Sequence, residues 1–211
     1  MTGPVLHALA SAALLFGALL TSTAWASSSA EELVRQARAH EAAREDDIAV
    51  RRYMEALAIE PRSEDAWMGL AALRMKLGDL AECERVYSSA LDRVPTLHGA
   101  LEGRARARWA MGRHAEAESD LDAFATLEQN GAALRELAEW YGFDGRTPAQ
   151  LATWRRLLAL ALERVDRASE REARLMVRAL VMVVDGADPA SSPTAPDATR
   201  RALAAIARRG G

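Results

Sequence analysis

The same kinds of residue recur at intervals of 34 residues through the first half of the chain. An interval of this length holds two helices of roughly a dozen residues and two turns, and such a hairpin cannot bury its apolar stripe alone. Neighbouring hairpins must stack, with small residues where the helices approach most closely. The positions that keep the interval are Leu33, Trp67 and Leu101; Ala37, Ala71 and Ala105; Ala49, Cys83 and Ala117; Tyr53 and Tyr87; Ala56 and Ala90; and Pro61 and Pro95.

These spacings and residue types resemble the tetratricopeptide repeat. The resemblance is best over residues 64–97, and the stretches 30–63 and 98–131 match chiefly in their second helices. It implies three repeats over residues 29–131, the outer two degenerate, and an all-α, tetratricopeptide-like helical-hairpin solenoid with irregular C-terminal helices. In residues 64–97 the resemblance is carried by Trp67, Leu70, Ala71, Gly78, Cys83, Tyr87, Ala90 and Pro95, whereas Gln36, His40, Arg104 and Arg108 stand where the family prefers Leu and Tyr.

Helix-capping patterns and the apolar period locate the individual helices. Asp79 and Ser169 each precede a Glu by three residues, as in a capping box. Beyond residue 130 the period blurs, and residues 132–185 are expected to hold a degenerate fourth hairpin and a capping helix. That last helix is apolar nearly all round from Leu175 to Val184, which is typical of a buried helix. Helices are expected at about 30–43, 46–60, 64–77, 80–93, 98–111, 114–128, 148–165 and 170–185.

The N-terminal residues 1–26 differ in character from the rest. They contain no Asp, Glu, Lys or Arg, are apolar from Val5 to Leu20, and finish in Ala24-Trp25-Ala26. This pattern resembles a secretory signal peptide cleaved before Ser27, and it predicts a periplasmic or secreted protein. A basic first segment is missing, so the alternative is a protein anchored in the membrane by an uncleaved N-terminal segment.

The C-terminal end divides into a linker and a short basic segment. Residues 186–196 are rich in proline and serine, and residues 197–211 are expected to form a short basic helix. Three interpretations of that helix remain open: a docked cap, a flexible tail, or a segment that contacts anionic lipid or a partner. Membrane contact is expected only through this helix or an uncleaved N-terminus. The net charge of −3 gives no indication of nucleic-acid binding.

Catalytic and metal-binding patterns are nearly absent from the sequence. The histidines lie far apart, and we find no phosphate-binding loop, nucleophile elbow or metal-ligand spacing. The single cysteine, Cys83, occupies a small-residue position and is interpreted as a buried apolar contact. The sequence therefore predicts a protein that is not an enzyme and that holds no cofactor or metal.

A binding groove is predicted on the first helices of the hairpins, about 100° beyond the packing stripe. Its arginines are expected to pair with a partner's carboxylates, while its methionines and Trp109 would bury a partner's side chain. The alternatives are a partly solvated helix face, or a groove filled by the C-terminal helices. The predicted groove consists of Val34, Arg38, Met68, Ala72, Met75, Glu102, Arg106 and Trp109, with Glu41 beside it.

Together these patterns predict an exported protein–protein interaction module that binds a peptide or protein partner and acts in bacterial envelope assembly or regulation. Some members of the resembled family clamp a chaperone's C-terminal carboxylate with polar groove residues. This chain has Val34, Gly69, Gly99 and Gly103 at four of those positions, so the sequence predicts that this clamp is absent. The alternative function is a structural subunit of an envelope complex, held through its apolar C-terminal helices. Such a subunit should be insoluble or unfolded alone, whereas a binding module should be soluble and monomeric.

Overall fold

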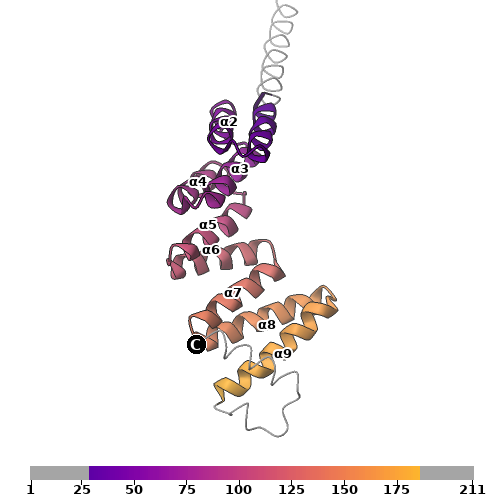
Figure 1. The fold of residues 1–211 in the computed structure, drawn as a ribbon. Helices are drawn as coiled ribbons and strands as arrows, with labels where there is room; N and C mark the ends of the chain where they lie inside the picture. The colour runs from indigo at the N-terminus through magenta and orange to yellow at the C-terminus, as the bar shows by residue number, and fades with distance from the viewer. Residues whose placement is uncertain (1–28, 186–211) are drawn as a thin grey trace, which may run out of the picture. The chain divides into compact units, whose positions relative to one another are not determined.

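A computed structural model describes residues 29–185, and this part of the chain consists of helices joined by short turns (Figure 1). The all-α prediction is confirmed for these residues. The expected signal peptide, linker and basic C-terminal helix lie outside them. A helix over residues 29–42 comes first, followed by α2 (Asp46–Ile59), α3 (Glu64–Lys76), α4 (Leu80–Arg93), α5 (Gly99–Ala110), α6 (His114–Leu127), α7 (Gly131–Phe143), α8 (Thr147–Glu163) and α9 (Arg167–Val184).

Helices that follow one another in the chain pack against one another. Contacts join α2 to α3 and α3 to α4, and they join α6, α7, α8 and α9 in the same consecutive manner. The contacts gather into two compact units, of which the first ends at Gly103 and the second begins at Arg104. Within the described range, residues 29–103 form the N-terminal unit and residues 104–185 form the C-terminal unit.

The small residues that recur every 34 positions are buried where the interval predicts close helix contacts. Ala56 and Ala90 have no exposed surface, and neither do their counterparts at the other two alanine positions. Cys83 is equally buried, and this burial raises the pKa of its thiol to about 11. The sequence register of the first three hairpins is therefore confirmed by burial. The remaining fully buried members of the set are Ala37, Ala71, Ala105, Ala49 and Ala117.

The repeated tyrosines each contact a glycine that repeats at the same interval, and the sequence analysis did not predict this contact. The ring of Tyr53 lies against Gly69, where an added Cβ would be 2.5 Å from the ring. The ring of Tyr87 lies against Gly103 in the same way, and a Cβ there would overlap the ring. Each glycine therefore makes room for the tyrosine of the preceding helical hairpin.

The helix ends follow the capping rules with one correction. Gly78 and Gly112 have φ of +77° and +76°, a left-handed conformation that suits glycine beyond a helix end. Asp79 caps α4 by accepting a hydrogen bond from the backbone N–H of Glu82, as predicted. The predicted cap at Ser169 is wrong, because Asp166 caps α9. Ser169 lowers the pKa of the Asp166 carboxyl, chiefly through its hydroxyl and to a smaller extent through its backbone N–H.

The helix α9 is not the buried capping helix that its apolar sequence suggested. It packs on α8 through one face, and its fully buried residues are Ala173, Ala179 and Leu180. Val184 at its end is 50% exposed. The exposed Arg178 interrupts the apolar run and turns one face of the helix to water. In residues 29–185 we find no helix with the length and apolarity that crossing a bilayer requires.

Candidate protein-binding surfaces

The first predicted groove residue, Val34, belongs to the core. It is 4% exposed and lies between Ala30 and Ala37, which are fully buried one turn away on either side. These three residues form one stripe at helical spacing, so the buried face of the helix over residues 29–42 includes the position assigned to the groove. Val34 is therefore unavailable to a partner, and this part of the prediction is wrong.

The other predicted groove residues of the N-terminal unit are more accessible. Ala72 is exposed, and Met68 and Met75 are half-buried on the same face of α3. Glu102 on α5 is half-buried. The guanidinium of Arg38 donates to the carboxylate of Asp65 over 2.8 Å, joining the first helices of adjacent hairpins. Both side chains of this pair are well exposed, so the pair contributes little to stability.

In the C-terminal unit the predicted groove residues have structural partners. Arg106 donates two hydrogen bonds, of 3.0 and 2.8 Å, to the carboxylate of Glu136. The Trp109 ring is stacked between two others, with centroids 4.0 Å from His114 and 4.3 Å from Trp140. Trp140 is buried, and the stack ties α5, α6 and α7 together. Trp109 is therefore half-buried in a ring stack, and its role as an anchor for a partner's side chain stays a prediction.

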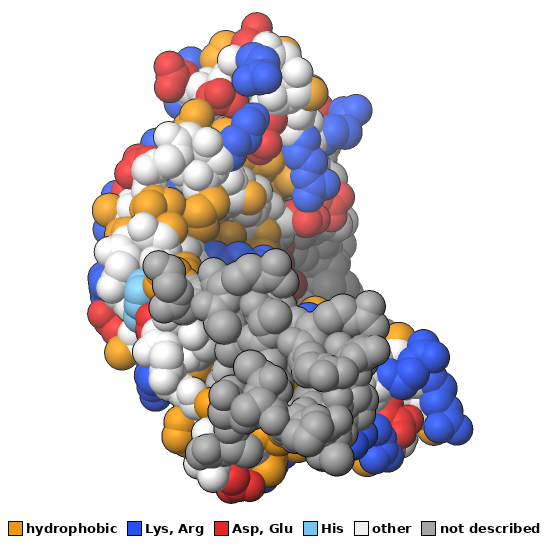
Figure 2. Space-filling model, turned by 60° about the horizontal axis from the view of Figure 1, so that its bottom comes forward, with side chains coloured by type: hydrophobic (Ala, Val, Ile, Leu, Met, Phe, Trp, Pro, Cys, Tyr) orange, Lys and Arg blue, Asp and Glu red, His pale blue; other side chains and the backbone are white. Residues whose placement is uncertain are grey.

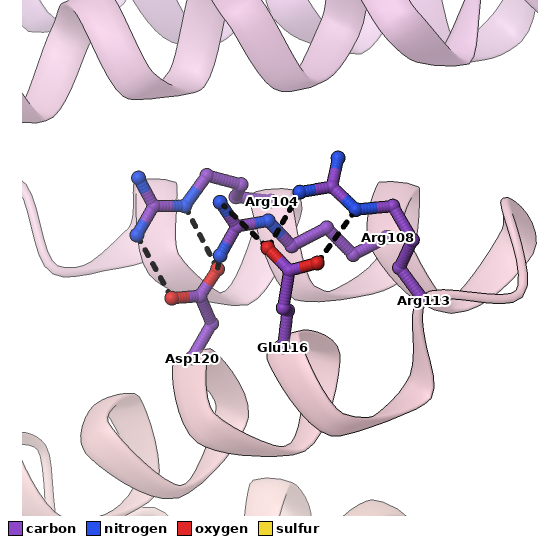
Figure 3. A network of polar contacts seen from close by, with 5 residues as sticks. All are labelled: Arg104, Arg108, Arg113, Glu116 and Asp120. Carbon is purple, nitrogen blue, oxygen red and sulfur yellow. Dashed lines mark hydrogen bonds and ion pairs between the residues drawn. The ribbon is translucent and has the colours of Figure 1, made fainter.

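Two arginines that depart from the repeat pattern meet a buried carboxylate (Figure 3). Asp120 accepts two hydrogen bonds of 2.8 Å from Arg104 and one of 2.7 Å from Arg108. The Asp120 side chain is 8% exposed, and the arginine side chains are 18% and 15% exposed. Glu116 pairs with both Arg108 and Arg113 at the outer edge of the cluster. The degenerate third repeat thus replaces apolar contacts with a hydrogen-bonded ion network.

A hollow of about 400 Å³ opens on the N-terminal unit between α2, α3 and α4, and we call it the α2–α4 hollow. Its lining includes Met54, a large apolar residue that is 56% exposed. Its edge includes Trp67, which is half-buried and donates an indole hydrogen bond of 3.0 Å to the carbonyl of Pro61. The lining residues are Met54, Leu57, Ala58, Pro61, Trp67, Leu70, Arg74, Glu82, Arg85, Val86, Ser89 and Arg93.

The charges around the α2–α4 hollow are predominantly basic. Arg85 pairs with Glu82 on the same helix, and Arg74 reaches Asp79 over 3.4 Å. Arg93 is exposed and makes no ion pair with any residue in the described range 29–185. Three arginines and one glutamate therefore line the hollow. Among the coloured side chains on the face drawn in Figure 2, basic and acidic groups are interspersed.

A similar hollow in the C-terminal unit is lined by an arginine that pairs with an acid of the same unit. It measures about 260 Å³ and is lined by residues of α6, α7 and α8. There Arg156 donates to the carboxylate of Asp122 and, over 3.0 Å, to the hydroxyl of Thr126. Asp122 follows Met54 by two 34-residue intervals. The position that carries a paired acid in the C-terminal unit thus carries an exposed methionine in the N-terminal unit.

Solved structures with the same arrangement of helices identify the fold. A tetratricopeptide repeat protein from Parabacteroides merdae is 16% identical with a TM-score of 0.62, over 86% of this chain and 73% of that one. MamA from Desulfovibrio magneticus RS-1 is 13% identical with a TM-score of 0.60, over 86% and 94%. The chain has a tetratricopeptide-type fold. No protein-family model matches the chain, and no curated protein matches it.

A third solved structure with this fold is YrrB, described as a tetratricopeptide repeat protein with an unusual peptide-binding site. It is 11% identical, with a TM-score of 0.57 over 84% of each chain. In tetratricopeptide terms, α2 and α4 are second helices of their hairpins and α3 is a first helix. The α2–α4 hollow therefore involves the second helices, whereas the sequence predicted binding on the first helices. Sequence reasoning missed it because Met54 and Arg93 look like members of an ordinary solvated helix face.

The described residues offer little for chemistry beyond binding. Within residues 29–185, no group of His, Cys, Asp and Glu side chains is arranged to hold a metal ion. The Nδ1 atom of His114 lies 3.1 Å from a carboxylate oxygen of Asp144, and the His114 ring is stacked on Trp109. His40 pairs with Glu45 in the turn before α2. His40 and His114 thus each have a structural neighbour, and they lie in different units.

Proposed function

We propose that this protein is an exported helical-repeat module that binds a peptide or protein partner, and that the α2–α4 hollow receives an apolar side chain of that partner. The observation that carries this proposal is the open, apolar-lined hollow itself, with Met54 exposed at its edge. The volume of about 400 Å³ lies within the range of ligand pockets, roughly 300–1,000 Å³.

The energetics favour an apolar anchor at this site. Burying a leucine- or phenylalanine-sized side chain contributes about 1.5–3 kcal/mol, and Met54 would lose its own exposed surface at the same time. Helices on three sides form the hollow without a partner present, and a preformed site reduces the ordering cost of association. YrrB shares the fold and is described as having a peptide-binding site, which supports peptide recognition as a role for this chain.

Affinity capture tests this function with a matched pair of variants. The mature protein would be immobilised and exposed to the envelope fraction of its native source, as wild type, Met54→Asp and Ile59→Asp. Ile59 is also exposed on α2, at 43%, but does not line the hollow. Wild type and Ile59→Asp should retain the same partner, and Met54→Asp should lose it. Equal capture by all three, or no specific partner for any, would refute binding at the hollow.

The export component of the proposal has its own test. A signal peptide ending in Ala24-Trp25-Ala26 would give a mature protein beginning near Ser27, located in the periplasm or secreted. A role in envelope assembly or regulation is part of this proposal, and an exported location would support it. Mass spectrometry of the protein from its native source should show a chain that begins near Ser27. An intact N-terminus in the membrane fraction would instead support the anchored alternative.

The structural-subunit alternative has one observation in its favour. The last two helices expose apolar side chains, including Leu162 at 48% and Val184 at 50%. A subunit held through this surface should aggregate or unfold when it is produced alone. Size-exclusion chromatography and circular dichroism of the mature chain separate the two functions, since a folded, soluble monomer is the result expected for a binding module.

A further inference from the structure

The charges around the α2–α4 hollow determine what kind of partner segment suits it, and this inference rests on the proposed function. We infer that the segment carries an apolar anchor flanked by carboxylates, as in an acidic peptide. Three arginines and a single glutamate line the hollow. A segment with basic flanks would bring like charges together at its rim, whereas an acidic one is electrostatically complementary.

The three arginines differ in how readily they can accept a new carboxylate. Arg93, at the end of α4, is exposed and has no ion pair within residues 29–185. The Arg85 side chain is 73% exposed, and its pair with Glu82 is three residues away on the same helix. Exposed pairs of this kind are weak, so a partner's carboxylate can bind the Arg85 guanidinium beside Glu82 or in its place at little cost. Charge-assisted hydrogen bonds to Arg93 and Arg85 are therefore available to an incoming acid.

In the corresponding hollow of the C-terminal unit, the arginine already has acceptors within the chain. There Arg156, which lines the hollow, donates to the carboxylate of Asp122 and to the hydroxyl of Thr126 on α6. In the N-terminal unit the corresponding acid is absent, because Met54 stands two intervals before Asp122. Within the described residues, the hollow of the N-terminal unit thus has an arginine without an acid partner, Arg93, beside exposed apolar surface at Met54. A segment of another molecule that carries a carboxylate and an apolar side chain would pair with the first and cover the second.

A peptide library tests the inference directly. Random twelve-residue peptides displayed on phage would be panned on the immobilised mature protein. Enriched sequences should carry one bulky apolar residue with at least two Asp or Glu close to it. One enriched peptide would then be synthesised, together with a version in which its acidic residues are replaced by lysine, and the Kd of each would be measured by fluorescence anisotropy.

Variants of the protein identify the charges that matter. Arg93→Glu should weaken binding of the acidic peptide about tenfold, because it removes a close attractive charge pair and introduces a repulsive one. Arg51→Glu makes the same charge change on α2 outside the hollow lining and should alter Kd less than about twofold, since exposed distant charges are screened. The lysine peptide should bind Arg93→Glu better than it binds wild type.

The possible outcomes separate the inference from the proposed function. Peptides whose binding needs Met54 but shows no preference for acid, and no effect of Arg93→Glu, would overturn the acidic partner and leave the binding module intact. Failure of Met54→Asp to weaken any enriched peptide would refute the site itself. Vesicles containing phosphatidylglycerol serve as a second probe. Vesicle binding that Arg93→Glu abolishes, with no acidic peptide enriched, would assign the arginines to a membrane and overturn the inference.

Discussion

Replacing Asp120 with valine should destabilise the C-terminal unit strongly. The substitution removes three hydrogen bonds, of 2.8, 2.8 and 2.7 Å, from two guanidinium groups that are largely buried. Removing one partner of a buried ion pair typically costs about 3–5 kcal/mol, because the remaining charge is left without compensation. Glu116 stays 3.8 Å from Arg108 and compensates part of this loss, whereas Arg104 loses both of its bonds to Asp120. We therefore expect the lower end of the range, about 3 kcal/mol.

Thermal and urea unfolding followed by far-ultraviolet circular dichroism measure this effect. A loss of about 3 kcal/mol should lower Tm by about 6–12 °C in a chain of this size. The control is the double variant Arg104→Leu/Asp120→Val, which introduces the residues found one interval earlier, Leu70 and Val86. Because an ion pair can be replaced by packed apolar side chains with little loss, the double variant should be more stable than the single one. A single variant as stable as wild type, or a double variant no better than the single, would refute the structural role of the network.

Further predictions concern packing and the buried thiol. Gly69→Ala should lower the free energy of unfolding by about 1–3 kcal/mol, because the new methyl would lie 2.5 Å from the Tyr53 ring. In Gly99→Ala the methyl meets only a side-chain methyl at 3.6 Å, so its stability should change by less than about 1 kcal/mol, and equal melting of the two variants would contradict the ring contact. Cys83 should react with iodoacetamide much faster in guanidinium chloride than in the native state, because burial raises its pKa to about 11; fast native labelling would show that it is accessible. Since its folded pKa lies above the ordinary 9.0, stability should fall as pH rises from about 9 to about 11, and this component should be missing in Cys83→Ala when urea unfolding is compared across that range. Trp109→Ala should lower stability by roughly 2–4 kcal/mol because it breaks the ring stack, and an unchanged Tm would show that the stack contributes little to the fold.

Helix positions and hairpin contacts were predictable because they depend on local and periodic signals. The recurring alanines identified the buried contacts, and Asp79 with its capping pattern located the start of α4. Both members of the Tyr53–Gly69 contact recur at the 34-residue interval, but a glycine inside a helix does not indicate which side chain lies over it. A repeated glycine sixteen residues after each repeated tyrosine was the signal that could have revealed it.

The binding surface was less predictable because it depends on which side chains find partners across helices. Arg106 looked available in the sequence, yet Glu136 on α7 holds it with two hydrogen bonds. Trp109 looked like an exposed anchor, yet rings from two other helices enclose it. Met54 gave no signal at all, since its importance comes from the hollow beside it. Pairing and cavity shape are tertiary properties, and a 34-residue period does not encode them.

Photo-crosslinking at position 54 in the native envelope tests the central claim most directly. Benzoylphenylalanine would be introduced in place of Met54 and, as the control, in place of Ile59, which is exposed on the same helix outside the hollow. If the α2–α4 hollow receives the partner, irradiation should give one discrete adduct from position 54, and the arginine variant Arg93→Glu should diminish it. No adduct from position 54, or the same adduct from position 59, would show that the hollow is not where this protein binds.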